Sequence, residues 1–192
     1  ILPRPDRLGE ELASYASALN AVEGNTTFYA SPSPATVERW AVQVPEDFWF
    51  VLKAPREVTH ERRLRDVGGP LRRFLDLVAP LGDRIGAVTL QLPASFAPAD
   101  LEVLTAVARR LPSEVRWAVE VRHPGFFEGD GLDALDDVLG RHGIERVVFD
   151  TRVLFAQPPS SAAEREAWER KPRLPVLARA LTDRPIVRFI GR

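Results

Sequence analysis

Polar side chains stand at or near the ends of several apolar runs of this chain, where ordinary core residues would be expected. The run Ala21–Tyr29 carries a carboxylate, an amide and a hydroxyl at every second position, and the run Asp47–Lys53 ends on a lysine. Later runs repeat the plan with amide, carboxylate and guanidinium groups. The residues singled out in this way are Glu23, Asn25, Thr27, Lys53, Gln91, Glu120, Arg122, Asp150 and Arg188, and two histidines, His60 and His123, lie in the loops that follow two of the runs.

These residue types suit proton transfer and the binding of an anion. Glu23 and Glu120 can serve as a general acid and base pair, and Lys53 can act as a Schiff-base nucleophile or as an anion clamp. Arg122 and Arg188 suit bidentate capture of a phosphate or a carboxylate. The same charges can also form buried ion pairs with no catalytic role. The candidate catalytic residues are Glu23, Lys53, Glu120 and Asp150, and the candidate substrate-binding residues are Asn25, Thr27, His60, Gln91, Arg122, His123 and Arg188.

Two histidines raise the question of a metal. His60 and His123 each follow a predicted strand, and together with Glu23, Glu120 or Asp150 they can supply ligands for a divalent cation. The chain has neither an H-x-H nor an H-E-x-x-H spacing. The sequence therefore requires no cofactor, and a divalent metal stays an open alternative.

Strands and helices alternate along the chain. The predicted strands are Ala21–Tyr29, Asp47–Lys53, Ile85–Leu92, Val115–Arg122, Glu145–Asp150 and Pro185–Ile190. Helices are predicted over Arg7–Asn20, after Ser33-Pro34 (an N-cap followed by proline at the first helical position), from Gly68, over Asp100–Leu111, over Leu132–His142 ending at Gly143, and in two short pieces within 151–184.

Consecutive βα units imply parallel strands joined by right-handed crossovers. A doubly wound open sheet would usually carry a glycine-rich phosphate loop after its first strand, and this chain has none there. We therefore predict an α/β fold of the TIM-type (β/α) barrel class, in which the site lies at the carboxyl ends of the strands.

Side-chain alternation sharpens this prediction. A period of two puts Glu23, Asn25 and Thr27 on one face of their strand, and it puts Glu120 and Arg122 together on another. An ionised carboxylate packed against apolar helices is costly unless it is paired. We therefore expect a ring of charges inside the barrel, near its C-terminal rim. Its members would be Glu23, Lys53, Glu120, Arg122, Asp150 and Arg188.

Composition sets the outer limits. The 192 residues suit a single domain spanning 1–192, with 45% hydrophobic and 28% charged residues. The formal net charge of −1 provides no global basic field for nucleic acid. The chain has no cysteine, no signal peptide and no apolar run of transmembrane length, so we expect a cytoplasmic protein without a membrane partner. It uses 24 arginines but only 2 lysines, which makes Lys53 stand out.

Longer motifs resemble a known family. Glu23-Gly-Asn-Thr-Thr-Phe-Tyr29 and Phe50-Val-Leu-Lys-Ala-Pro-Arg-Glu-Val-Thr-His60 are similar to the signature of the YecE-like family (domain of unknown function 72), as are Leu90–Pro93, Trp117–Pro124 and Val187–Arg192. The resemblance implies a TIM-type barrel found chiefly in bacteria and archaea. Gly24 and Ile190 depart from the residues usual in that family. The family's first and last strands are not visible here, so the resemblance implies an incomplete barrel.

Two classes of function follow. In the first, the protein is an enzyme, a hydrolase or lyase that acts on a small anionic substrate by acid/base chemistry of glutamate and lysine. In the second, it is a non-catalytic binding or scaffold protein for an anionic metabolite, a nucleic acid or a protein. The near-neutral charge disfavours an extended nucleic-acid duplex as the partner. The oligomeric state is not indicated by the sequence.

Overall fold

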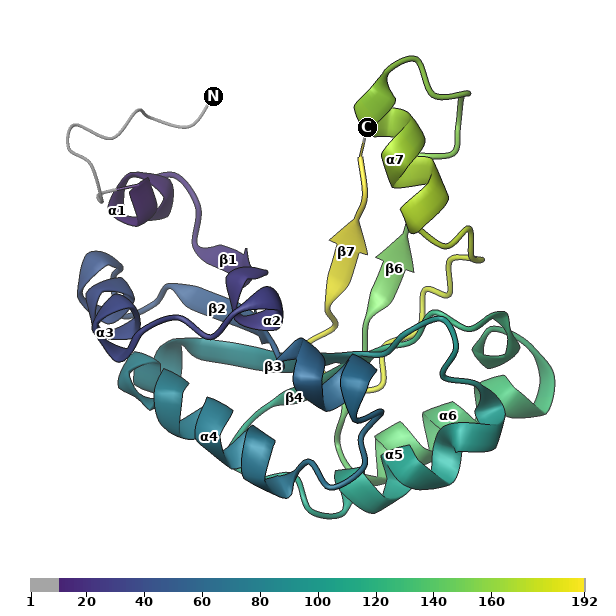
Figure 1. Ribbon diagram of the computed structural model, residues 1–192, viewed down its shortest axis with the longest axis horizontal. Coiled ribbons are helices and arrows are strands. Elements are labelled where there is room, and N and C mark those ends of the chain that lie inside the picture. The colour runs from purple at the N-terminus through teal and green to yellow at the C-terminus, as the bar shows by residue number, and fades with distance from the viewer. Residues whose placement is uncertain (1–10, 192) are drawn as a thin grey trace. The chain divides into compact units, whose positions relative to one another are not determined.

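The computed structural model describes residues 11–191, and Figure 1 shows helices and strands alternating along that range. The strands are β1 (Ala21–Gly24), β2 (Trp49–Lys53), β3 (Ile85–Gln91), β4 (Trp117–Glu120), β5 (Glu145–Arg146), β6 (Val148–Asp150) and β7 (Val187–Phe189). The α-helices are α1 (Glu11–Ala16), α2 (Thr26–Tyr29), α3 (Pro34–Gln43), α4 (Gly68–Val78), α5 (Leu101–Ala108), α6 (Gly129–Arg141) and α7 (Ala162–Arg170). A π-helical turn, η1 (Glu57–Glu61), and three 3-10 turns, η2 (Ala79–Arg84), η3 (Pro98–Asp100) and η4 (Pro124–Phe126), complete the described elements.

Five strands form one sheet in the order β1-β2-β3-β4-β5, and β6 pairs with β7 in a second sheet. The pairs β1–β2, β2–β3, β4–β5 and β6–β7 are parallel. Between β3 and β4, the Val88 N–H donates to Arg116 O and the Leu92 N–H donates to Glu120 O. The equal advance along both chains makes this pair parallel as well. The predicted α/β fold with parallel strands is therefore confirmed at this level.

The chain divides into two compact units. The first comprises the described residues up to Thr89 together with Pro112–Arg116. In this unit α1 contacts α3, and α3 contacts α4. Val37 of α3, Leu52 of β2 and Val78 of α4 are fully buried in its core.

The second unit comprises Leu90–Leu111 and the described residues from Trp117 onward. Here α5 contacts α6, and Figure 1 shows β6 and β7 side by side. All four residues of β4 are buried, as is usual for a strand of a parallel sheet. The prediction of a single domain over 1–192 stays a prediction.

Two of the predicted helix-end signals, Ser33-Pro34 and Gly143, are confirmed. The Ser33 side chain accepts a hydrogen bond from the Thr36 N–H at 3.2 Å, and Pro34 begins α3. Gly143 follows α6 with a φ of 63°, the left-handed conformation that glycine adopts without steric cost. Among the described residues, none of the helices is long and apolar enough to cross a membrane.

The strand predicted over Ala21–Tyr29 is too long. It ends at Gly24, because Asn25 has helical dihedral angles and begins the short helix α2. The two consecutive threonines favoured a strand by propensity. In the structure the Thr27 hydroxyl instead lies 2.8 Å from Lys53 O and 3.1 Å from Gly24 O. The prediction that Asn25 and Thr27 share a strand face with Glu23 is therefore wrong.

Two other predicted segments differ. The strand predicted over Glu145–Asp150 is interrupted at Val147, and its halves β5 and β6 pair with different strands. The segment 151–184 has one described α-helix, α7, in place of two. The helix predicted over Arg7–Asn20 starts outside the described residues, and its described part, α1, ends at Ala16 instead of Asn20.

Candidate functional site

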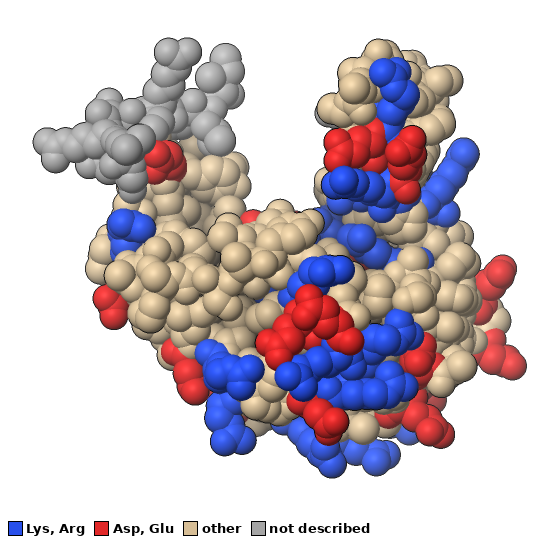
Figure 2. Space-filling model, viewed as in Figure 1, with Lys and Arg blue, Asp and Glu red and all other residues tan. Residues whose placement is uncertain are grey.

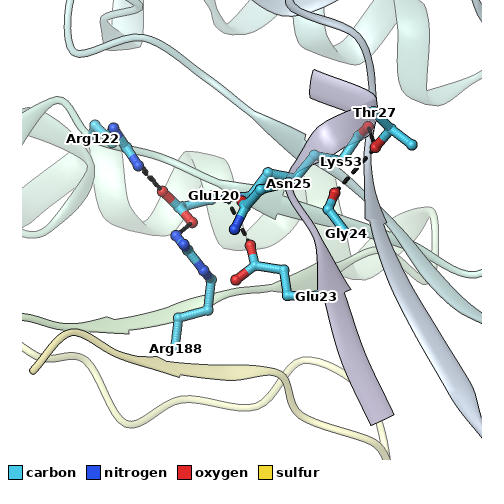
Figure 3. A network of polar contacts seen from close by, with 8 residues as sticks. All are labelled: Glu23, Gly24, Asn25, Thr27, Lys53, Glu120, Arg122 and Arg188. Carbon is cyan, nitrogen blue, oxygen red and sulfur yellow. Dashed lines mark hydrogen bonds and ion pairs between the residues drawn. The ribbon is translucent and has the colours of Figure 1, made fainter. Parts of the chain in front are cut away.

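The candidate residues gather in two groups, one in each unit. In the first unit the Lys53 Nζ donates to Glu23 Oε1 at 2.7 Å and to Asn25 Oδ1 at 2.6 Å (Figure 3). The Lys53 side chain is 5% exposed and that of Glu23 is 28% exposed. This group therefore offers a nearly buried ammonium next to a carboxylate that solvent can reach.

Short strands and one hydroxyl position these groups. Lys53 is the last residue of β2, where it lies opposite Thr89 of β3. Thr27 holds the Lys53 carbonyl, which ties α2 to the end of β2. At Gly24, an added Cβ would lie 3.0 Å from Leu52 Cδ2, so the Leu52 side chain takes the room that a larger residue would need. This contact explains how the strand stays packed with glycine at that position.

His60 lies beside aromatic and hydroxyl groups of the same unit. It belongs to η1, and its ring meets the Phe28 ring edge-on with centroids 5.1 Å apart. Its Nδ1 lies 2.9 Å from the Thr59 hydroxyl oxygen. The sequence placed His60 in a loop, whereas the structure places it in a π-helical turn.

The second group centres on Glu120, the last residue of β4, whose side chain is fully buried. Its Oε1 accepts from Arg122 Nε at 2.8 Å and from Arg122 Nη2 at 2.7 Å. Its Oε2 accepts from Nη1 of Arg188 on β7 (Figure 3). One buried carboxylate thus holds two guanidinium groups that are far apart in sequence.

An aromatic ring also contacts both arginines. The guanidinium carbons of Arg122 and Arg188 lie 5.4 Å and 5.5 Å from the centroid of the Phe149 ring. The two arginine side chains are 14% and 12% exposed. Guanidinium groups held by a carboxylate and by a ring face lose most of their freedom. The sequence predicted that Glu120 and Arg122 would share a face, and their ion pair agrees with that prediction.

Three further candidates of the second unit make contacts of their own. Gln91 is buried at the end of β3. The His123 Nδ1 accepts the Gly125 N–H at 3.0 Å, which places the proton of the neutral ring on Nε2. The Asp150 carboxylate accepts hydrogen bonds from Nε and Nη2 of Arg152 and from the Arg152 backbone N–H. The hydrogen bonds from Arg152 lower the pKa of the Asp150 carboxyl below its usual value.

Sequence reasoning missed a second buried set of charges. Arg146 is 2% exposed, donates to Asp136 Oδ1 at 2.9 Å and also donates to the Phe126 carbonyl. Burial lowers the pKa of the Arg146 guanidinium, and the hydrogen bond with Asp136 opposes that shift. Glu145 is fully buried beside it. A signal was present, since two adjacent charged residues within a predicted buried strand need partners.

Convergence of the two groups into one ring of charges stays a prediction. A metal site was the open alternative for the histidines and carboxylates. Within residues 11–191, no three His, Cys, Asp or Glu side chains are grouped so that they could hold a metal ion.

A family described as "Protein of unknown function DUF72" matches residues 2–192. The chain belongs to the DUF72 family. The resemblance to YecE-like proteins is therefore confirmed.

Other DUF72 proteins extend the match. UPF0759 protein YecE of Escherichia coli K12 is 42% identical over 191 residues, which cover 98% of this chain and 70% of that protein. The crystal structure of the DUF72 protein EF0366 of Enterococcus faecalis V583 is similar, with a TM-score of 0.73 at 22% identity over 94% of this chain and 69% of that one. That of TM1631 of Thermotoga maritima MSB8 has a TM-score of 0.70 at 26% identity, over 98% of this chain and 68% of that one. These likenesses support the α/β fold.

Proposed function

We propose that this DUF72 protein is an enzyme that acts on a small anionic substrate, bearing a phosphate or a carboxylate, by acid/base chemistry at the carboxyl ends of its strands. The observation that carries the proposal is the pair Arg122 and Arg188, held by the buried Glu120 and by the Phe149 ring. Arginine pairs of this kind match the planar oxygens of an anion.

The bonding of Arg122 supports a role in binding. Its Nε and Nη2 are both used on Glu120 Oε1, and its Nη1 takes no part in these bonds. A guanidinium that is already oriented loses little entropy when a ligand anion arrives. We assign Arg122 and Arg188 to anion binding.

Exposure separates the roles of the two glutamates. Glu120 is fully buried and bonded by two arginines, so it suits the role of orienting those arginines. Glu23 is 28% exposed and pairs with Lys53, and a general acid or base must reach the proton that it transfers. We therefore assign proton transfer to Glu23. Lys53 then acts as an ammonium, since a neutral amine would give up its ion pair with Glu23.

Titration calorimetry with inorganic phosphate and a set of phosphorylated metabolites tests the binding step. Loss of one charged hydrogen bond costs about 1.5–3 kcal/mol, so Arg122→Ala with Arg188→Ala should weaken phosphate binding by a factor of ten or more. Arg141→Ala, which removes an exposed ion pair with Asp137, is the matched control and should bind as the wild type does. Equal affinity of the double variant and the wild type would rule out the anion site.

A second experiment separates an enzyme from a binding protein. The protein is incubated with a cell-derived metabolite pool, and mass spectrometry follows the loss of any component. We expect the wild type to consume a phosphorylated or carboxylated compound, and Glu23→Gln to bind that compound without consuming it. If the wild type binds an anion but consumes nothing, the alternative function as a binding protein or scaffold is favoured.

Surface charge bears on the choice of partner. Figure 2 shows acidic and basic side chains interspersed on the visible face, and the net charge is −1. Extended nucleic-acid binding would instead need a basic stripe. We therefore propose a small anion as the partner. We also propose a cytoplasmic location, which fractionation of cells would test.

We further propose that the parallel strands belong to a TIM-type (β/α) barrel. Residues 145–150 support this, because the first half pairs with β4 and the second half pairs with β7. Residues 145–150 thus continue the strand order from β4 to β7, as closure of a barrel requires. Since the resemblance implies an incomplete barrel in this chain, the test is a crystal structure of the longer relative YecE of Escherichia coli K12, 42% identical. An open sheet in that structure would contradict this proposal.

A further inference from the structure

The buried carboxylate of Glu145 is not a member of the anion-binding pair, and its partners all come from the backbone or from a hydroxyl. Its Oε1 accepts the Arg146 N–H at 2.9 Å and the Leu181 N–H at 3.1 Å. Its Oε2 accepts the Thr182 N–H at 3.1 Å and also contacts the Thr182 hydroxyl. Burial of a carboxylate is costly, and these donors offset that cost only while residues 181 and 182 stay in place.

A second anchor holds the same segment from α6. Asp136 accepts from Arg179 at 2.8 Å through Oδ2 and from the buried Arg146 at 2.9 Å through Oδ1. Residues 179–182 are therefore fixed at two points, one on β5 and one on α6. We call these residues the anchored segment.

The strand that follows the anchored segment has little to hold it. β7 has three residues, and it pairs with β6 in a sheet of two strands. Val187 is 44% exposed and Phe189 is 75% exposed, so neither side chain stabilises the strand by full burial. A two-stranded sheet is marginal without such packing. The position of β7, and of Arg188 within it, must depend on contacts nearby.

We propose that Glu145 is a positioning residue for the anion site, because it fixes the anchored segment and thereby brings β7 alongside β6 with Arg188 on Glu120. The register supports this chain of contacts, since Arg188 lies opposite Phe149, the ring that its guanidinium contacts. The inference rests on the proposed anion binding by Arg188.

Two readouts on the same variants test it. Titration with inorganic phosphate measures binding, and amide hydrogen exchange measures the β6–β7 pairing through the Val148 N–H bonded to Ile186 O and the Ile190 N–H bonded to Asp150 O. The variants are Glu145→Gln, the milder Thr182→Val, and Arg188→Ala. Leu104→Ala, in the core of the same unit on α5, is the control for a general loss of stability.

We expect Glu145→Gln to weaken phosphate binding by about threefold to tenfold and to speed exchange at Val148 and Ile190, with a smaller effect of Thr182→Val in the same direction. Leu104→Ala should melt at a lower temperature with unchanged phosphate affinity. If Glu145→Gln does not fold, Thr182→Val decides alone. If Thr182→Val then showed the phosphate affinity and the amide exchange rates of the wild type, the inference would be overturned.

The failures of the two proposals are distinguishable. If Arg188→Ala loses phosphate while Glu145→Gln binds it as the wild type does, the positioning role is wrong and the anion site stands. If Arg188→Ala binds phosphate normally, the assignment of Arg188 to anion binding is wrong. In that case, amide exchange at Val148 and Ile190 in Glu145→Gln decides whether Glu145 positions β7. Exchange at the wild-type rate would overturn that role.

Discussion

At the scale of single residues, replacement of the nearly buried Lys53 should destabilise the protein. Its ammonium is nearly buried and bonds Glu23 and Asn25. Lys53→Met removes the ammonium that bonds both side chains, and we expect the free energy of unfolding to fall by about 1–3 kcal/mol. Urea unfolding measures this change. The other lysine provides the control, because Lys171→Met lies outside the group, and equal effects of the two substitutions would contradict the prediction.

Asp150 gives a prediction about pH. Hydrogen bonds from Arg152 lower the pKa of the Asp150 carboxyl in the folded protein, so this pair stabilises the fold above the unfolded pKa of about 4. That contribution is lost as the pH falls through the lower, folded pKa. In Arg152→Ala we expect Asp150 to titrate at a higher pH by nuclear magnetic resonance. The stability difference from the wild type should be present at neutral pH and vanish in acid.

The exposure of Arg152 limits the size of that effect. Its side chain is 73% exposed, so solvent and salt screen the pair. Arg141→Ala, which leaves Asp150 untouched, should not move the titration of Asp150. An unchanged Asp150 titration in Arg152→Ala would mean that Arg152 is not the cause.

At the scale of elements, the turn between η1 and α4 has an unusual backbone. Arg63, Leu64 and Asp66 have φ values of 48°, 65° and 52°, a region that residues other than glycine seldom adopt. Asp66 is exposed, so its replacement by glycine tests the backbone with little change in packing. We expect Asp66→Gly to raise the free energy of unfolding by about 0.5–1 kcal/mol.

A helical position gives the matched control for that substitution. Asp76 is exposed within α4, and Asp76→Gly should lower the free energy of unfolding by roughly 0.5 kcal/mol because glycine is a poor helix former. Urea unfolding of both variants shows whether the two changes in the free energy of unfolding have opposite signs. Loss of stability in Asp66→Gly as well would show that the aspartate side chain, and not its dihedral angle, matters there.

At the scale of the whole molecule, the net charge of −1 gives no general attraction for anions. Phosphate should therefore stabilise the protein only through its local site. At ten times its dissociation constant we expect a gain of about 1.4 kcal/mol, seen as a melting temperature roughly 3–5 °C higher. The Arg122→Ala, Arg188→Ala variant should show no such rise, and chloride at equal ionic strength is the control.

Sequence patterns predicted the parallel α/β order because buried strands and capped helices carry local signals. Ser33 before Pro34, and Gly143 after α6, marked their helix ends correctly. One of the failures lies at Thr27. Thr27 favours a strand by propensity, yet its contact with Lys53 O, 26 residues away, stabilises a helix. A pattern read over a short stretch of sequence cannot predict a contact between residues so far apart.

The candidate site was predictable to a similar extent. Charged groups in apolar strands indicated Glu120, Arg122 and Lys53, and the structure gives each an ionic or hydrogen-bonded partner. Their roles were not predictable, because exposure separates Glu23 from Glu120 and only the fold sets exposure. Glu145 carried a signal as a charged residue in a predicted buried strand, but its donors at residues 181 and 182 come from a segment without one.

The sequence spacing of the Glu120 contacts has a consequence for the order of folding. Arg122 lies two residues from Glu120, whereas Arg188 lies 68 residues away. Closing the longer loop carries a larger entropic cost, about 0.6 kcal/mol for each doubling of its length. During synthesis Arg122 can reach Glu120 long before Arg188 has left the ribosome. The second arginine therefore arrives last, and phosphate binding during refolding would report the docking of β7 rather than the earlier collapse of the sheet.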